Sequence, residues 1–161
     1  MTRLDTKPST EECNCFAVRA AARHVTQFYD HFLAPTGLRA SQFSVLARLK
    51  RKGPLTINAL AEDMIMDRTT LSRNILPLER DGLITIQPAA YDRRAKELHL
   101  TKAGEKRRQA AAKAWSQAQA RFNSVFGAKR GADFRAMLRA VVASEFVPAD
   151  RGRVPADRQV G

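Results

Sequence analysis

The chain has 161 residues, of which 44% are hydrophobic and 27% charged, a composition typical of a globular domain rather than of a collagen-like or disordered chain. Its 28 lysines and arginines outnumber its 16 aspartates and glutamates, and the net charge of +12 indicates an anionic partner, with nucleic acid the leading candidate. The sequence has no apolar run of the roughly 20 residues that span a bilayer, no apolar secretory core near its start, and only two cysteines. We therefore expect a cytoplasmic protein with no membrane partner.

Apolar residues at spacings of three and four predict a first helix over about residues 15–33. Its N-cap is expected at Ser9 or at Asn14, since both residue types cap helices. Ser41 is the expected N-cap of a second helix, which ends in a basic turn before Gly53.

A short helix is expected within residues 55–64, capped by Thr56 or Asn58. A further helix is expected over residues 67–81, with Asp67 as its N-cap. Gly82 is expected at the position that follows the C-cap of this helix.

Pro77 lies inside the helix over 67–81 and is expected to kink or loosen it, because proline lacks a backbone donor. Alternating residues at 83–86 and 96–100 predict the two strands of a β-hairpin with a basic tip. A helix from about 102 to 126 follows, and at about 1.5 Å per residue it is too long to bury inside a small domain. A break at 127–131 and a final amphipathic helix complete the mainly α-helical order of a winged helix-turn-helix.

The helix over 67–81 is the expected DNA-recognition helix, because polar residues fill its first two turns and apolar residues occupy one opposite face. Hydroxyl and guanidinium groups at a helix N-terminus bind phosphate oxygens and base edges. An ordinary solvated helix is the alternative, but a basic run that starts at Arg93 and Arg94 on the hairpin tip favours a nucleic-acid surface. The candidate DNA-binding residues of the helix are Arg68, Thr69, Thr70, Ser72, Arg73 and Asn74.

The hairpin tip and the residues that follow it carry a specific pattern. Asp92-Arg93-Arg94, followed by Leu100-Thr101-Lys102-Ala103-Gly104, resembles the wing motif Asp-x-Arg…Leu-Thr-x-x-Gly of the MarR family of bacterial winged-helix regulators. The resemblance extends over about residues 15–145. Supporting matches are Leu60-Ala61, Arg68 to Arg73 and Leu78 to Ile84.

This resemblance implies a homodimer that is joined through its first and last helices and acts mostly as a repressor. It also implies that Arg94 enters the minor groove of double-stranded DNA while Asp92 helps to hold it in place. Thr70, Ser72 and Arg73 match residues that face the major groove.

Together, these observations divide the chain into a winged helix-turn-helix domain over 38–101 and a helical dimerisation region made of 13–35 and 102–146. Residues 1–12 are expected to be a flexible N-terminus, and 147–161 a disordered tail. A single small lobe cannot cover the apolar faces of the long and final helices, whereas a two-fold pair can. Such a pair would place its recognition helices about 34 Å apart, which predicts a pseudo-palindromic operator.

One branch of the family senses organic peroxides through a cysteine near the start of the first helix, and Cys15 resembles that residue. A thiol at a helix N-terminus is favoured as the thiolate, which is the form that reacts with peroxide. The branch holds its cysteine with tyrosines, of which only Tyr29 is present, because Arg19 and Ala40 occupy the other two positions. Cys13 adds a second candidate redox thiol. The alternative is that both cysteines have only a packing role.

A small aromatic ligand between the dimer helices and the winged domain is the other effector that the family suggests. The candidate lining residues are Phe28, Phe32, Phe43 and Trp115, although aromatic residues at helical spacing more often form the core. His24 and His31 do not have the spacing of a recognised zinc site, and neither a metal nor a cofactor is expected.

The sequence lacks the nucleophile, phosphate-loop, dinucleotide and metalloprotease motifs of common enzymes, so we do not expect an enzyme. The main alternative to a sequence-specific regulator is an architectural protein that binds nucleic acid without sequence preference through its charge of +12. The wing motif and the expected two-fold pairing favour the regulator.

Overall fold

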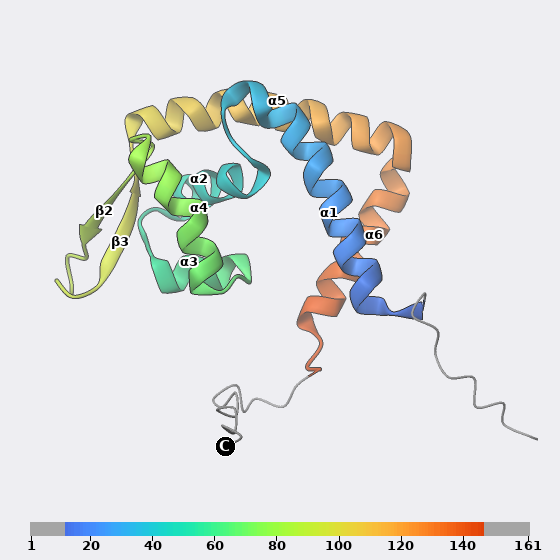
Figure 1. Cartoon of the computed structure of the whole chain (residues 1–161), viewed down its shortest axis with the longest axis horizontal. Helices are drawn as coiled ribbons and strands as arrows, with labels where there is room; N and C mark the ends of the chain where they lie inside the picture. Colours follow the sequence, from blue (N-terminus) through green and yellow to red (C-terminus); the bar gives the residue numbers. More distant parts are fainter. Residues whose placement is uncertain (1–11, 147–161) are drawn as a thin grey trace, which may run out of the picture. The chain divides into compact units, whose positions relative to one another are not determined.

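The computed structural model describes residues 12–146 (Figure 1). In this range the chain is mainly helical with a small antiparallel sheet, as predicted. Ser9, residues 1–11 of the expected flexible N-terminus and the expected tail over 147–161 lie outside the described range. The elements in chain order are α1 (Asn14–Leu33), the single turn η2 (Ala34–Thr36), α2 (Ala40–Lys52), β1 (Leu55–Thr56), α3 (Ile57–Met64), α4 (Arg68–Arg80), β2 (Ile84–Pro88), β3 (Lys96–Leu100), α5 (Lys102–Phe126) and α6 (Ala128–Ala143).

The chain divides into two compact units, with the boundary inside α5 between Ala120 and Arg121. The first unit contains one apolar core, to which α1, α2, α3, α4, the sheet and the first half of α5 all contribute. This core fixes the helix-turn-helix against the hairpin. Its largest fully buried side chains are Leu33, Val45, Leu46, Leu60, Leu71, Leu78, Ile84 and Leu98.

The sheet has the strand order β1-β3-β2 and is antiparallel throughout. The predicted hairpin is confirmed as β2 and β3, although the first strand begins at Ile84 and continues to Pro88. β1 was not predicted, because Leu55 and Thr56 were assigned to the helix that follows. A strand of two residues is too short to show alternation, and it is identified only by its pairing with β3.

Several helix ends have the capping residues that were expected. Thr56 caps α3 by accepting a hydrogen bond from the Ala59 N–H at 3.1 Å. Asp67 caps α4, and Gly53 and Gly82 follow α2 and α4 with positive φ angles of 82° and 69°. Local residue identity therefore determines these ends.

Two other predicted caps are wrong. Asn14 is the first residue of α1, whose N-cap is Cys13. Ser41 lies inside α2, whose N-cap is Arg39, and the side chain of Gln42 accepts a hydrogen bond from the Arg39 N–H at 2.9 Å. The Ser41 hydroxyl donates instead to the Asn74 side chain on α4. The sequence pattern of a helix cap does not reveal such a distant partner.

The helices on either side of the hairpin have close to the predicted bounds, and α6 begins earlier than expected. α4 continues through Pro77 to Arg80. α5 has the predicted length, but the break after it is confined to Gly127, and α6 starts at the next residue. Gly127 has a φ of 95°, a conformation that favours glycine.

The second unit contains the end of α5 together with α6. The rings of Phe126 and Phe122 have centroids 5.3 Å apart, and those of Phe126 and Phe134 are 5.9 Å apart. The Arg130 guanidinium lies over Phe126 at 4.6 Å, so it covers one face of this aromatic group. Each helix within residues 12–146 is too short or too polar to cross a membrane.

Candidate nucleic-acid interface

α4 has one buried face and one exposed face. Leu71, Ile75 and Leu78 are at most 2% exposed, and they attach the helix to the core. The predicted DNA-binding residues lie around the remainder of the helix. Arg68, Thr69, Thr70 and Arg73 are exposed, whereas Ser72 and Asn74 are half-buried.

The start of α4 is fixed by its cap. The Asp67 carboxylate accepts hydrogen bonds from the Thr70 N–H at 2.8 Å and from the Thr70 hydroxyl at 2.6 Å. These bonds, the hydroxyl bond foremost, lower the pKa of Asp67 because they stabilise its ionised form. The Thr70 hydroxyl proton is therefore engaged, and its oxygen remains able to accept a bond.

Like the Thr70 hydroxyl, the Asn74 side chain is bound by the protein itself. The amide nitrogen donates to the Thr70 carbonyl oxygen at 2.9 Å, and the amide oxygen accepts from the Ser41 hydroxyl at 2.6 Å. The nitrogen also lies 3.9 Å from the Met66 sulfur. That Asn74 contacts DNA stays a prediction, whereas these bonds show that its side chain links α4 to α2.

The supporting helix α3 is held to α2 by ion pairs that the sequence analysis missed. The Asp63 carboxylate accepts from Arg48 Nε at 2.7 Å and also binds Lys52 Nζ. The hydrogen bond from Lys52 is the largest cause of the lowered pKa of Asp63. The partners are 11 and 15 residues from Asp63, so no helical spacing within one element signals them.

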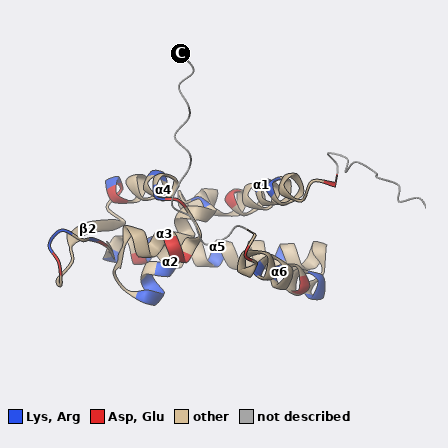
Figure 2. Ribbon diagram, turned by 90° about the horizontal axis from the view of Figure 1, so that it is seen from below, with Lys and Arg blue, Asp and Glu red and all other residues tan. Residues whose placement is uncertain are grey.

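The wing tip places its arginines in the solvent. Asp92 Oδ1 accepts from the backbone N–H of Arg94 at 2.9 Å, and the Ala95 N–H donates to the Asp92 carbonyl at 3.0 Å. Asp92 therefore shapes the turn that carries Arg94, and the DNA contacts of these residues stay a prediction. Asp92, Arg93 and Arg94 are all exposed, and within residues 12–146 neither arginine forms an ion pair. Figure 2 shows the basic residues along the loop that joins β2 to β3.

The residues after the wing explain the Leu-Thr-x-x-Gly part of the motif. The Thr101 hydroxyl donates to the Gly82 carbonyl at 2.7 Å, and its oxygen accepts from the Gly104 N–H at 2.9 Å. It thereby ties the start of α5 to the end of α4. A Cβ atom at Gly104 would lie 2.0 Å from the Leu83 carbonyl oxygen, so only glycine allows this close approach.

The basic run that extends into α5 is partly used inside the protein. Glu105 accepts two hydrogen bonds from Arg108, at 2.7 and 3.0 Å, and lies 3.7 Å from Lys50 Nζ. The Arg108 bond is the main cause that lowers the Glu105 pKa to about 2, and the same bond raises the pKa of Arg108. Arg107 donates to the Thr36 carbonyl at 2.9 Å. The exposed basic residues of this run are Arg93, Arg94, Lys96, Lys102 and Lys106.

The two cysteines are reduced and exposed at the start of α1. Tyr29 lies 14 positions after Cys15 on the same helix, about 21 Å away at about 1.5 Å per residue. Its hydroxyl donates to Gln119 Oε1 at 2.8 Å. Within a single chain, Tyr29 therefore lies far from both thiols. Residues 12–146 contain no group of three or more His, Cys, Asp or Glu residues placed to hold a metal ion.

The four aromatic candidates form two separate pairs. Phe28 and Phe32 have ring centroids 5.2 Å apart, and Phe43 and Trp115 are 6.3 Å apart. Phe43 is buried in the core, whereas Trp115 is 41% exposed. The candidate ligand pocket made by these four residues remains a prediction.

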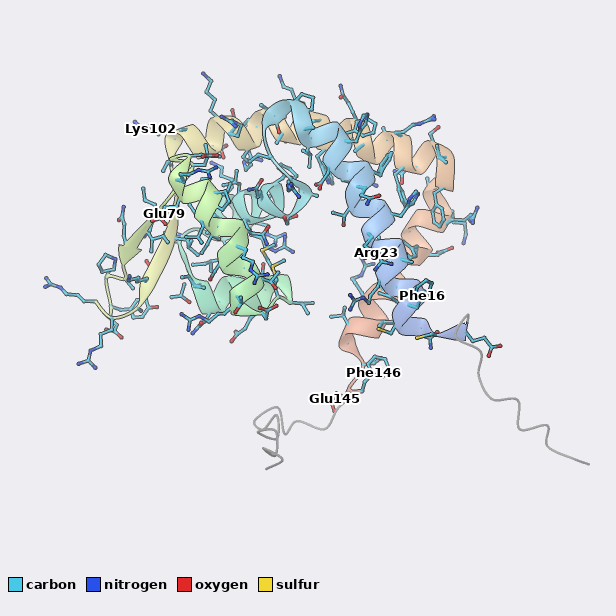
Figure 3. All side chains as sticks on the ribbon, in the orientation of Figure 1. Phe16, Arg23, Glu79, Lys102, Glu145 and Phe146 are labelled. Atoms are coloured by element: carbon cyan, nitrogen blue, oxygen red, sulfur yellow. The ribbon has the colours of Figure 1, made fainter. Side chains whose placement is uncertain are left out.

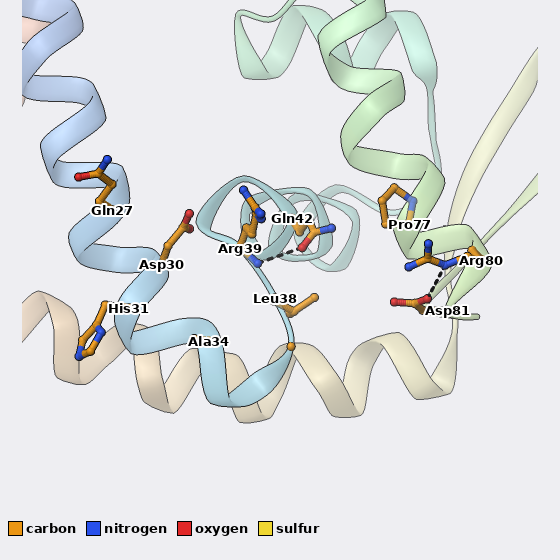
Figure 4. Close-up of a pocket in the computed structure, with 11 residues that line it drawn as sticks. Gln27, Asp30, His31, Ala34, Leu38, Arg39, Gln42, Pro77, Arg80 and Asp81 are labelled. Carbon is orange, nitrogen blue, oxygen red and sulfur yellow. Dashed lines mark hydrogen bonds and ion pairs between the residues drawn. The ribbon is translucent and has the colours of Figure 1, made fainter.

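A hollow of about 700 Å³ lies between α1, the start of α2 and the end of α4, and none of these aromatic residues lines it (Figure 4). Its lining combines polar and apolar residues and carries both signs of charge. Among the lining residues are Asp30, His31, Arg39, Arg80 and Asp81.

Comparisons with known proteins agree with this arrangement. The model of the MarR family matches residues 38–96, which include α2, α3, α4, β2 and the tip of the wing. Over 90 residues, 56% of this chain, the sequence is 29% identical to the organic hydroperoxide resistance transcriptional regulator of Bacillus subtilis and 32% identical to the uncharacterized HTH-type transcriptional regulator YwoH of the same organism. The matches span 61% and 65% of these two relatives, less than two thirds of their lengths.

Among solved structures, the transcriptional regulator MosR of M. tuberculosis in complex with DNA is similar over most of both chains. The two sequences are 36% identical, the match covers 82% of this chain and 98% of that chain, and the TM-score is 0.70. The exposed face of α4, the wing motif and these similarities lead to one conclusion: the chain belongs to the MarR family of transcriptional regulators.

Proposed function

We propose that the protein is a sequence-specific, DNA-binding transcriptional regulator that acts as a repressor in the cytoplasm. The observation that carries the proposal is the exposed first half of α4, whose opposite face is buried. Arg68, Thr69 and Arg73 are exposed there, and neither arginine forms an ion pair within residues 12–146. MosR, the relative solved in complex with DNA, supports this choice of partner. Proteins of the MarR family are regulators rather than enzymes, in agreement with the expected absence of an activity.

The electrostatics fit a duplex with two kinds of contact. Arginines on α4 are suited to guanine edges in the major groove, where bidentate hydrogen bonds discriminate between bases. The exposed arginines of the wing are suited to the narrower minor groove and to phosphates. Asp92 keeps the backbone of Arg94 in one conformation, which reduces the entropy that is lost on binding.

A homodimer is part of the proposal, because each unit exposes apolar side chains that water would otherwise surround. Phe16 on α1 is 62% exposed (Figure 3), and on α6 Met137 is 67% and Val142 59% exposed. A two-fold pair would cover such surfaces and align two recognition helices with an inverted repeat. Sedimentation of the purified chain is expected to give a dimer, and Met137→Glu is expected to shift it towards monomer and to weaken operator binding.

Competition binding separates this function from architectural binding without sequence preference. A labelled operator, first selected from random DNA, is mixed with increasing unlabelled random duplex of the same length. A specific regulator retains the operator at a large excess of competitor, because specific sites bind about 10³-fold tighter or more. Displacement at an equal concentration of random duplex would instead support the architectural alternative.

Release by an oxidant is the second part of the proposal, and it is supported by two exposed thiols and by the relative named as an organic hydroperoxide regulator. The thiolate sulfur of Cys15 would attack one peroxide oxygen, so that the O–O bond breaks, an alcohol leaves and a sulfenic acid remains. A small aromatic ligand is the other effector that we retain.

DNA binding before and after one equivalent of organic peroxide tests the oxidant. The wild type is expected to lose affinity, Cys15→Ser to keep it, and Cys13→Ser to show whether the second thiol participates. Equal affinities for the wild type in both states would mean that the cysteines have only a structural role.

A further inference from the structure

The Asn74 amide on α4 has a single orientation that the structure determines. Its nitrogen faces the Thr70 carbonyl oxygen at 2.9 Å, and its oxygen faces the Ser41 hydroxyl at 2.6 Å. Because a carbonyl oxygen can only accept, the donating nitrogen must lie on the Thr70 side. Asn74 thus links α4 to Ser41, a residue 33 positions earlier in α2.

The first turn of α2, which carries Ser41, is itself attached to α1. Asp30 Oδ1 accepts from the Ala40 N–H at 2.6 Å. This N–H is one of the groups at a helix start that have no partner within the helix, and the helix dipole favours a carboxylate there. Ser41 follows Ala40 directly, so hydrogen bonds continue from α1 through the start of α2 to the middle of α4.

This arrangement constrains a motion that apolar packing leaves open. Leu71 and Ile75 hold α4 against the core, but hydrophobic contact is not directional and permits small rotations about the helix axis. A hydrogen bond has a narrow range of lengths and angles and therefore restricts that rotation. Arg73 immediately precedes Asn74, so a rotation at Asn74 would change the direction of the Arg73 guanidinium.

We propose that Ser41 and Asn74 are positioning residues for DNA recognition, and that the hydrogen bond between them sets the rotation of α4 in the major groove. The proposal rests on the proposed function, since it takes α4 as the recognition helix. Asn74 acts through Ser41 rather than by contact with a base. Loss of either partner should therefore weaken the same property, namely the discrimination between operator and random DNA.

A double-mutant cycle on the full-length chain tests the pair. Ser41→Ala and Asn74→Ala are each expected to lower operator affinity about fivefold, the effect of losing one hydrogen bond, with little change on random duplex. The double variant is expected to bind no more weakly than Asn74→Ala, because the hydrogen bond that Ser41→Ala removes is already absent from Asn74→Ala.

Two further variants and a stability measurement make the cycle specific. Ser41→Thr keeps the hydroxyl and is expected to bind like the wild type. Ser44→Ala removes another half-buried hydroxyl from α2 and is the matched control, with no expected effect on discrimination. Urea unfolding of each variant shows whether the fold is retained, so that lost specificity is measured on folded protein.

The outcomes are distinguishable. A loss for Asn74→Ala with Ser41→Ala unchanged would assign a direct base contact to Asn74 and overturn the positioning role. Equal losses on operator and random DNA would also overturn it, because a rotated helix affects base contacts first. A wild type without any preferred sequence would overturn the proposed function, and the inference with it, and the wild-type arm alone reveals that case.

Discussion

Arg94 combines an exposed side chain with a fixed backbone, since Asp92 Oδ1 holds its N–H at 2.9 Å. We predict that Arg94→Ala weakens operator binding and lowers the dependence of the logarithm of affinity on the logarithm of salt concentration by about 1, because one phosphate-neutralising charge is lost. Binding measured across a salt series checks both effects.

Arg135→Ala provides the control for this measurement, because it removes an equal charge from an exposed position on α6. It is expected to leave the salt dependence nearly unchanged. If the two variants have the same affinity and slope, the wing does not contact DNA as proposed.

Gly104 is a residue whose role lies in the close contact between two chain segments. We predict that Gly104→Ala destabilises the fold by about 1–3 kcal/mol, because the added Cβ would meet the Leu83 carbonyl oxygen at 2.0 Å and force the start of α5 away. Urea unfolding measures the change. Ala103→Ser, at the exposed neighbouring position, is expected to change stability little, and an equal loss in both variants would contradict the steric account.

At the scale of the elements, the parts of the fold that depend on local residue identity could be predicted from the sequence. Asp67 and Thr56 cap their helices because a short polar side chain reaches N–H groups only two or three residues ahead. The buried stripe of α4 follows from the helical period, and that period also placed the exposed residues of the candidate interface.

Features that depend on distant partners could not be predicted in this way. β1 exists only through pairing with β3, and Asp63 finds Arg48 across 15 residues. Asn74 is a polar residue in the first half of α4, where a DNA contact is expected, and only the structure reveals its hydrogen bonds to Ser41 and Thr70. Ile65, in the turn before α4, has a φ of 52°. This left-handed conformation is rare for isoleucine, so the residue type does not predict it.

Glu105, at the start of α5, is expected to make the stability of the fold depend on pH. Because the folded-state pKa of Glu105 is about 2, below its ordinary value of 4.5, its ionised form stabilises the fold above about pH 4.5. This contribution is lost as the pH falls towards 2. We predict that Glu105→Gln costs about 1 kcal/mol at pH 7 and that the difference from the wild type shrinks between pH 5 and pH 3.

Urea unfolding at pH 7, 5 and 3 measures this dependence. Glu79→Gln, an exposed glutamate on α4 without an ion pair among the described residues, is the matched control. A cost for Glu105→Gln that is constant across the three pH values would show that Arg108 does not stabilise the carboxylate.

For the molecule as a whole, the account combines a net charge of +12 with a small set of exposed, positioned contacts. Charge alone would give affinity for any nucleic acid. Internal ion pairs of Lys50, Lys52, Arg48 and Arg108 engage part of that charge, and the wing tip keeps its arginines unpaired within the described range. This distribution favours recognition at defined places over uniform attraction.

Selection of bound duplexes from random DNA, followed by sedimentation of the protein on the selected sequence, tests the central claim most directly. The account predicts an inverted repeat whose half-sites lie about one helical turn apart, occupied by two chains. Arg73→Ala is expected to relax the preferred bases within each half-site. Recovery of unrelated sequences, or one chain bound to each duplex, would contradict the account.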